Sequence, residues 1–213
     1  NSQVLIDGAQ GAAHIKINLK ELNADYYVAS AHKLCGPTGV GFLYGKSELL
    51  KSLPAYQGGG EMISNVTFEK TEYADLPHKF EAGTPNIAGV IAFGVALDYM
   101  NSIGFDNIEN HEKELLDYAT ENLKKIDGIK IFGDNNQKIS VISFNIGDHH
   151  PSDIGSILDQ FGIAVRTGQH CTQPIMDFYK LPGTVRASFS FYNTKSEIDL
   201  FIDALIKASK MLG

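Results

Sequence analysis

The stretch Ser30-Ala31-His32-Lys33-Leu34-Cys35-Gly36-Pro37-Thr38-Gly39 sets the predicted architecture of this chain. It follows an apolar run at 26–29 that predicts a buried strand, and its Gly-Pro and Thr-Gly pairs predict a turn. A hydroxyl, an imidazole and a lysine amine therefore lie where a strand gives way to a loop, which is where ligands bind in open α/β sheets. A lysine held there can lose its proton through desolvation and attack a carbonyl group. For Lys33 alone, an ordinary solvated side chain is the alternative.

Two more apolar runs, at 4–6 and 40–44, flank this stretch and predict further strands. Short links join the three runs, so we predict the sheet of an α/β domain. The first run ends in Asp7, and Gln10 follows in the same turn. Because the acid and the Ser-x-His-Lys segment each follow a strand, we expect Asp7 and Lys33 to lie at neighbouring carboxyl ends of the sheet.

A loop-rich segment at 54–86 precedes a helix predicted at about 87–102. Gly104 marks a predicted domain boundary, which separates a large-domain part, 1–103, from a small carboxyl-terminal α+β domain, 104–213. Apolar periodicity and capping residues predict the elements of this second part. They are helices that begin at Asp106 or Asn107, at 151–161 and after the capping box Thr194/Glu197, and strands at 129–132, 141–146, 163–165 and 185–192.

The composition is that of a globular chain with an acidic balance. Of the 213 residues, 43% are hydrophobic, and the formal net charge is −7. The chain has no basic stripe, so we expect no nucleic-acid partner. No apolar run reaches the length of a membrane span, so we expect no membrane partner. The two cysteines, Cys35 and Cys171, do not form a disulfide framework. They indicate a reducing compartment, and we expect a cytoplasmic protein.

The polar residues of the first sheet suit one cofactor in particular. Asp7 could simply close a turn, but beside Lys33 its carboxylate has a sharper use. Pyridoxal phosphate needs a carboxylate near its ring nitrogen, a lysine for its aldehyde, and hydroxyl or imidazole donors for its phosphate. We therefore predict a pyridoxal phosphate site from five residues, which are Asp7, Gln10, Ser30, His32 and Lys33.

The second half carries an arginine and a cysteine with chemical potential. Arg186 lies in a strand pattern among apolar residues, where an unpaired charge is costly. Its guanidinium fork suits a substrate carboxylate, and a structural ion pair is the alternative. Cys171 lies beside His170 and near Arg166, and cationic neighbours favour the reactive thiolate. A small buried hydrophobe is the alternative for a free cysteine, and it suits Cys35 better.

No metal site is predicted. His149 and His150 precede a helix, and a metal pair there is conceivable. Adjacent loop residues chelate poorly and no third ligand is near in the sequence, so we expect a solvated pair.

Three motifs resemble those of one enzyme family. Asp7-Gly8-Ala9-Gln10 and the 30–39 stretch are similar to the cofactor segment of class V, fold-type I pyridoxal phosphate enzymes. The segment 166–174, Arg-Thr-Gly-Gln-His-Cys-Thr-Gln-Pro, resembles the active-cysteine loop of cysteine desulfurases. Arg186-Ala187-Ser188-Phe189, followed by 191–194, resembles their substrate-arginine strand. The resemblance covers essentially the whole chain and is nearest to the SufS type, whose cysteine loop is short.

The resemblance implies roles for the cofactor residues. Lys33 would hold the cofactor aldehyde as a Schiff base and later move protons. Asp7 would pair with the pyridine nitrogen, and Gln10 would bond the ring oxygen. In a homodimer, the phosphate would be bound by Ser30 and His32 of one subunit and by Thr84 of the other subunit.

The resemblance also implies the chemistry of the second half. Arg186 would hold the carboxylate of L-cysteine, with Arg166 beside it in the substrate site. Cys171, with His170 in the catalytic set, would attack the substrate sulfur, become a persulfide and release alanine. The family often has His-His before the cysteine, whereas this chain has Gln169-His170. Cys35 has no role in the family that we can assign.

Family members are roughly twice as long as this chain. A front half would supply a ring-stacking histidine and further cofactor contacts, so we expect this chain alone to lack a complete cofactor pocket. The segment 58–63 also resembles the family, where it is mobile and near the active site and dimer interface.

We expect a pyridoxal phosphate-dependent cysteine desulfurase that passes sulfur to an acceptor protein for iron–sulfur cluster assembly. A selenocysteine lyase is the near alternative, because the same scaffold and thiol would serve both. Another class V enzyme, such as an aminotransferase with an incidental Cys171, is more distant. The non-enzyme alternative is a folded scaffold or partner-binding module.

Overall fold

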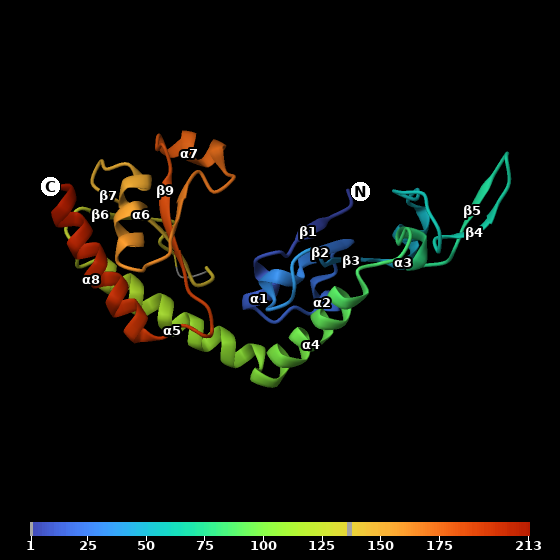
Figure 1. The fold of residues 1–213 in the computed structure, drawn as a ribbon, viewed down its shortest axis with the longest axis horizontal. Coiled ribbons are helices and arrows are strands. Elements are labelled where there is room, and N and C mark those ends of the chain that lie inside the picture. Colours follow the sequence, from blue (N-terminus) through green and yellow to red (C-terminus); the bar gives the residue numbers. More distant parts are fainter. Residues whose placement is uncertain (1, 136–137) are drawn as a thin grey trace. The chain divides into compact units, whose positions relative to one another are not determined.

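The structure is a computed structural model that describes residues 2–135 and 138–213. The chain divides into two compact units, Asn1–Phe105 and Asp106–Gly213, and Figure 1 shows the elements of each. Both units mix helices and strands, which confirms the predicted α/β class.

A three-stranded sheet forms the centre of the first unit. Its order is β1-β2-β3, with β1 parallel to β2 and β2 antiparallel to β3. The predicted runs at 4–6, 26–29 and 40–44 all form strands within a residue or two of the expected bounds. The elements of this region are β1 (Leu5–Asp7), α1 (Gly11–His14), α2 (Leu19–Leu22), β2 (Tyr26–Ser30), η1 (Ala31–Lys33), β3 (Gly41–Gly45) and α3 (Ser47–Ser52).

The predicted loop region at 54–86 contains a hairpin that the sequence did not reveal. Its strands are β4 (Ile63–Val66) and β5 (Thr71–Tyr73), and a short turn of helix follows at η2 (His78–Phe80). Thr67 closes the hairpin, because its backbone N–H donates to the Lys70 carbonyl at 2.8 Å. The strands are exposed throughout, so they lack the alternation of buried and exposed residues on which strand prediction depends.

Helix α4 (Ile87–Ile103) packs against the turn that carries Lys33, and its prediction is confirmed. The Asn86 side chain caps the helix by accepting the Gly89 N–H at 3.0 Å. A Cβ at Gly89 would come within 2.6 Å of Val40 Cγ2, and one at Gly36 within 3.0 Å of the Phe93 ring. The helix and the turn approach each other closely because both contact positions are glycine.

The second unit is a four-stranded antiparallel sheet with helices packed on its core face. The strand order is β6-β7-β9-β8. Of the helices, α8 begins with the predicted capping box of Thr194 and Glu197. The elements are α5 (Phe105–Leu123), β6 (Ile129–Phe132), β7 (Val141–Ile146), α6 (Pro151–Gln160), β8 (Arg166–Gly168), α7 (Gln173–Tyr179), β9 (Thr184–Ser188) and α8 (Lys195–Leu212).

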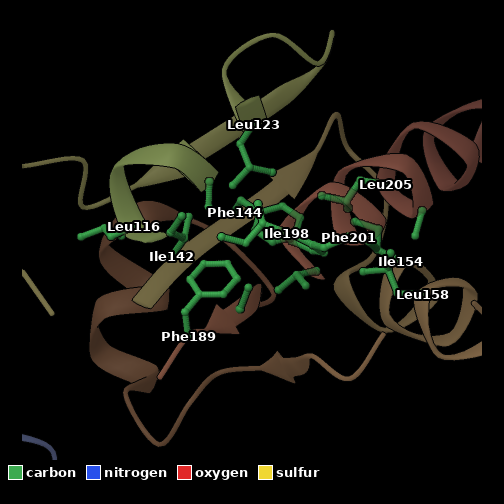
Figure 2. Close-up of a cluster of buried hydrophobic side chains, with 14 of the residues drawn as sticks. Leu116, Leu123, Ile142, Phe144, Ile154, Leu158, Phe189, Ile198, Phe201 and Leu205 are labelled. Atoms are coloured by element: carbon green, nitrogen blue, oxygen red, sulfur yellow. The ribbon is translucent and has the colours of Figure 1, made fainter. Parts of the chain in front are cut away.

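One apolar core holds the second unit together (Figure 2). Ile142 and Phe144 of β7 meet side chains of α5, α6 and α8. The Phe201 ring packs edge-on against Phe144, with centroids 5.9 Å apart, and also contacts Phe189. The opposite face of the sheet carries polar residues, because Ser143 and Arg186 alternate with core residues along their strands.

Two strand predictions in this unit are wrong. Residues 163–165 form no strand, and the ladder begins only at Arg166. The Ile163 N–H instead donates to the Leu158 carbonyl at 3.0 Å, at the end of α6. The strand predicted at 185–192 ends at Ser188, because the chain turns where the Asn193 side chain accepts the Ser190 N–H at 2.9 Å.

Within 2–135 and 138–213, no single helix is both long and apolar enough to cross a membrane, and α4 and α5 meet that test only as one bent pair.

Candidate active site

The carboxyl ends of two parallel strands bring the predicted cofactor residues of the first unit to one edge of the sheet. Asp7 ends β1 and pairs in register with Val28 of β2. The Gly8 N–H extends this pairing by donating to the Val28 carbonyl at 2.8 Å. β2 continues to Ser30, and Lys33 follows in the turn η1. Asp7, Ser30 and Lys33 therefore share this edge, as the order of the motifs predicts.

The Asp7 carboxylate is held by a local turn. Its Oδ1 accepts the Ala9 N–H at 2.9 Å, which fixes the side chain at the strand end. The carboxylate is exposed and forms no ion pair with any cation that the structure describes. Gln10 is also exposed and makes no side-chain capping bond to α1, at whose N-cap it lies. Both side chains are thus available to a ligand.

Tyr27 is a neighbour of this site that the sequence did not single out. A Cβ at Gly8 would overlap the Tyr27 ring, so the ring lies directly against the backbone that follows Asp7. The Tyr27 hydroxyl is buried and has no hydrogen-bond partner among the described residues. Burial first, and then the charge of Asp7, raises the pKa of this phenol. A tyrosine within an apolar strand gives no signal in the sequence that separates it from an ordinary core residue.

The turn η1 leaves His32 and Lys33 exposed, while Ala31 and the residues that follow the turn anchor it. Ala31 and Leu34 are buried. The Ala31 N–H donates to the Val40 carbonyl at 3.0 Å, and the Ala31 carbonyl accepts from both Leu34 and Gly36. His32 and Lys33 are exposed. Ser30 lies at the N-cap but makes no side-chain capping bond, which leaves its hydroxyl available.

Cys35 and Thr84 complete the predicted residues of the first unit. Cys35 is exposed, which corrects the prediction that it is a small buried side chain. Partial burial nevertheless raises the pKa of its thiol. Thr84 is exposed just before α4, in a segment held by the Gly83 N–H, which donates to the Gly60 carbonyl at 2.9 Å. Its contact with a partner subunit's phosphate stays a prediction.

Two arginines lie opposite each other on the adjacent strands β8 and β9 of the second unit. Arg166 of β8 pairs directly with Arg186 of β9. Like charges in this position repel each other. Neither guanidinium has a carboxylate within salt-bridge distance among the described residues, and Arg186 Nε is buried without a hydrogen-bond partner. Burial, and then Arg166, lowers the pKa of Arg186. This pair favours an anion between or beside the two strands, rather than the structural ion pair considered for Arg186.

The loop after β8 places a thiol beside this pair. Arg166 Nη2 lies 3.6 Å from the Cys171 sulfur, so a positive charge lies beside the thiol. The thiol is exposed. His170 and Cys171 both have positive φ angles, 56° and 62°. Thr172 closes the loop, because its N–H and its hydroxyl both donate to the Gln169 carbonyl, at 2.9 and 2.8 Å.

His170 turns inward, toward β9. Its Nε2 lies 3.1 Å from the Thr184 carbonyl oxygen and 2.9 Å from the Thr184 hydroxyl. Burial lowers the pKa of the ring, and the charge of Arg186 lowers it further. Thr184 is a neighbour of His170 that sequence reasoning missed, since the predicted strand began one residue after it.

Asn145 and His150 also have clear places. Asn145 of β7 is buried and donates from Nδ2 to the Gly183 carbonyl at 3.0 Å. His150 caps α6 by accepting the Ser152 N–H at Nδ1, at 3.3 Å, so one histidine of the adjacent pair has a local structural role.

Comparisons with known proteins bear on both groups of residues. The family model described as Aminotransferase class-V matches residues 1–201. A cysteine desulfurase of Cronobacter sakazakii is 46% identical over 212 residues, which are 99% of this chain and 52% of that protein. A probable cysteine desulfurase of Xylella fastidiosa is 49% identical over 209 residues, 98% of this chain and 50% of that protein. The chain spans about half the length of the curated relatives it matches.

Solved structures agree. The cysteine desulfurase CsdA of Escherichia coli, in an S-sulfonic acid form, aligns with a TM-score of 0.93 and 41% identity, over 98% of this chain and 52% of that one. The apo cysteine desulfurase of Thermococcus onnurineus NA1 aligns with a TM-score of 0.95 and 36% identity, over 99% of this chain and 53% of that one. The motifs, the two groups of polar residues and these likenesses together show that the chain belongs to the aminotransferase class-V family.

Proposed function

We propose that the whole protein is a pyridoxal phosphate-dependent cysteine desulfurase of the SufS type, which removes sulfur from L-cysteine and releases L-alanine. The observation that carries this proposal is the contact of 3.6 Å between Arg166 Nη2 and the Cys171 sulfur. Arg166 belongs to an arginine pair that has no carboxylate partner among the described residues. A thiol thus lies next to an arginine pair that can bind an anion. A reaction on a sulfur-containing amino acid needs both, the thiol for the substrate sulfur and the arginines for the substrate carboxylate.

The donor set of the first unit fits pyridoxal phosphate. A carboxylate, an amine and a hydroxyl, none of which has an ion pair or side-chain hydrogen bond to another side chain that the structure describes, meet at one sheet edge. We propose that Lys33 holds the aldehyde, that Asp7 faces the ring nitrogen, and that Gln10 faces the ring oxygen. When bound, the cofactor supplies an electron sink for the substrate's α-carbon. The phosphate would be held by Ser30 and His32 and, in a homodimer, by Thr84 of the other subunit.

Arg186 orients the substrate in this proposal. Its planar guanidinium binds a carboxylate with two parallel hydrogen bonds. Its Nε has no partner inside the described chain, so a bound carboxylate would satisfy a buried donor. Arg166 would contribute positive charge to both the substrate carboxylate and the Cys171 sulfur.

Cys171 takes up the sulfur. Its thiolate forms a bond to the substrate sulfur while the carbon–sulfur bond of the substrate breaks. The carbon keeps the electron pair and gains a proton, for which the Lys33 amine is the proposed donor, and alanine leaves. Because Cys171 is exposed, its persulfide could be reached by a thiol of an acceptor protein. We propose that this acceptor serves iron–sulfur cluster assembly in the cytoplasm.

The test is a pair of matched cysteine variants in the full-length, cofactor-loaded protein. Cys171→Ala should abolish alanine formation from cysteine, because no thiolate remains to accept the sulfur. Cys35→Ala should retain it, because partial burial raises the pKa of that thiol. Mass spectrometry after cysteine addition should show one added sulfur atom on the peptide that contains Cys171.

The alternatives give different results in the same experiment. Equal loss of activity in both cysteine variants would contradict the assignment. Alanine formation without any persulfide on Cys171 would favour another class V reaction. A much faster rate on selenocysteine than on cysteine would identify a selenocysteine lyase. Tight binding of a sulfur acceptor without turnover would support a partner-binding module.

A further inference from the structure

Histidine is the residue that most often transfers protons in enzymes, but the contacts of His170 indicate a different role. Its Nε2 lies within hydrogen-bond distance of two oxygens of one residue, the carbonyl and the hydroxyl of Thr184. A carbonyl oxygen only accepts, so Nε2 donates the ring proton in the tautomer that bonds to the Thr184 carbonyl. Thr184 is 1% exposed and pairs with Gly168 of β8. The ring is therefore tied to the first residue of β9.

The other ring nitrogen is closed off. Nδ1 of His170 is buried and has no hydrogen-bond partner among the residues that the structure describes. A proton carrier exchanges its proton through a ring nitrogen, and Nε2 is already engaged with Thr184. The charged groups that face the ring are Arg186 from β9 and Arg166 from β8. Burial first, and then these two charges, lower the pKa of the ring.

The ring's anchor matters because the loop is held in an unusual backbone conformation. His170 and Cys171 are consecutive residues with positive φ, which non-glycine residues adopt only when their surroundings impose it. Thr172 fastens one side of the loop through its two bonds to the Gln169 carbonyl. The His170–Thr184 contact fastens the other side, one residue before the thiol.

We propose that His170 is a positioning residue, which ties the Cys171 loop to Thr184 and keeps the thiol beside Arg166 without carrying a proton itself. This inference rests on the proposed reaction at Cys171. It replaces the catalytic role expected for His170 with a positioning role. It also makes Thr184 the residue that anchors the His170 ring.

Two substitutions at one position separate the roles. In His170→Gln the amide nitrogen lies where Nε2 lies and still reaches Thr184, but it cannot titrate. In His170→Asn the amide nitrogen lies nearer Nδ1 and falls short of Thr184. Asparagine also tolerates positive φ better than glutamine. A requirement for the backbone conformation alone would therefore favour Asn, whereas a requirement for the anchor favours Gln.

The full-length, cofactor-loaded protein is the material for this experiment, at equal bound cofactor. One lost neutral hydrogen bond corresponds to about a fivefold change in rate, and two to about twentyfold or more. We expect kcat for His170→Gln to stay within about fivefold of the wild type, with an unchanged pH profile, and His170→Asn to fall by at least about twentyfold. KM for cysteine should change little in either variant, because Arg186 is untouched.

A second pair of variants leaves His170 in place. Thr184→Val removes one of the two acceptors and should lower kcat by about three- to fivefold, whereas Thr184→Ser retains the hydroxyl and should rescue it. The rate at which iodoacetamide alkylates Cys171, measured without substrate, should follow the same order in all four variants. This rate reports the placement of the thiol beside Arg166 independently of turnover.

The outcomes are distinct. The inference is overturned if His170→Gln is as inactive as His170→Asn, or if it loses a limb of the pH profile, since either result identifies a proton carrier. It is also overturned if Thr184→Val and Thr184→Ser behave alike. Full activity in Cys171→Ala would instead refute the proposed reaction, whatever the His170 variants do.

Discussion

Direct packing between Gly8 and the Tyr27 ring holds the backbone at this position. A Cβ at Gly8 would overlap the Tyr27 ring, and the ring is 2% exposed and lies within the sheet. Neither residue can move without disturbing β1 or β2. The backbone that follows Asp7 is therefore held by sterics as well as by the 2.8 Å bond from Gly8 to Val28.

We expect Gly8→Ala to lower the free energy of unfolding by about 1–3 kcal/mol, because an added methyl group forces a packed core to shift. Gly60→Ala is the matched control, since a Cβ there would meet nothing within 4 Å, and it should change stability by less than about 0.5 kcal/mol. Urea unfolding followed by circular dichroism measures both. A Gly8→Ala protein as stable as the Gly60→Ala protein would contradict the close contact.

Arg186 permits a prediction about substrate binding. Arg186→Lys keeps the positive charge but removes the planar fork that binds a carboxylate with two bonds. We expect KM for cysteine to rise by about tenfold, which corresponds to one charged hydrogen bond. The control is Lys130→Gln, a cation on β6 of the same sheet whose Nζ lies over the Phe132 ring. Steady-state alanine formation measures both, and equal effects would exclude a specific carboxylate contact.

Among single residues, the sequence identified those whose chemical role follows from their type and spacing. Asp7 and Lys33 were expected at one sheet edge, and the register of β1 and β2 places them there. Thr184 and Tyr27 were not expected, because a threonine at a strand start and a tyrosine in an apolar run look like ordinary structural residues. Only the contacts with His170 and Gly8 distinguish them.

Among the elements, α8 has the clearest sequence signal and a testable origin. The Glu197 side chain accepts the Thr194 N–H at 2.7 Å, and Thr194 Oγ1 accepts the Glu197 N–H at 3.3 Å. The backbone bond from Thr194 first, and then bonds from the Thr194 and Asn193 side chains, lower the pKa of Glu197. The ionised carboxylate is thus the form that caps the helix.

A lowered pKa in the folded state means that the carboxylate stabilises the protein above its unfolded-state pKa, and that this contribution is lost as pH falls through the folded-state pKa. We expect Glu197→Gln to lower the melting temperature at neutral pH, and the difference from wild type to vanish in acid. Asp203→Asn, on the exposed side of the same helix, should show no such trend. Thermal melts from neutral to acidic pH measure this difference in melting temperature. A difference that does not change with pH would exclude stabilisation by the ionised Glu197 carboxylate.

Strand boundaries were the elements that sequence reasoning placed least well. Residues 163–165 and 189–192 have strand-like composition, but the Ile163 N–H donates to the end of α6 and the Ser190 N–H to the side chain of a turn. The β4–β5 hairpin was missed for the opposite reason, since its strands are exposed on both faces. Composition indicates which residues prefer strands, whereas ladder partners decide where a strand begins and ends.

For the whole molecule, the division into two units is the main organising feature. The described apolar core of the second unit runs from Leu115 to Leu212, inside Asp106–Gly213. A unit with its own apolar core is what an independently folding segment requires.

We therefore expect residues 106–213, expressed alone, to unfold in one cooperative transition. Leu205→Ala, at a fully buried position of α8, should lower the free energy of unfolding by about 2–5 kcal/mol. Leu200→Ala is the control on the same helix, because Leu200 is 62% exposed, and its effect should stay under about 0.5 kcal/mol. Urea titrations of the three proteins provide the measurement. A broad, non-cooperative transition in the parent segment would show that its core is incomplete.

The contrast between the two thiols has a practical consequence. The Cys171 sulfur lies beside a guanidinium, while partial burial raises the pKa of Cys35. A maleimide dye added in limiting amount near neutral pH should attach to Cys171 first. The native chain thus already offers a selective attachment point for a fluorophore, whose emission could follow the arrival of an acceptor protein without any engineered cysteine.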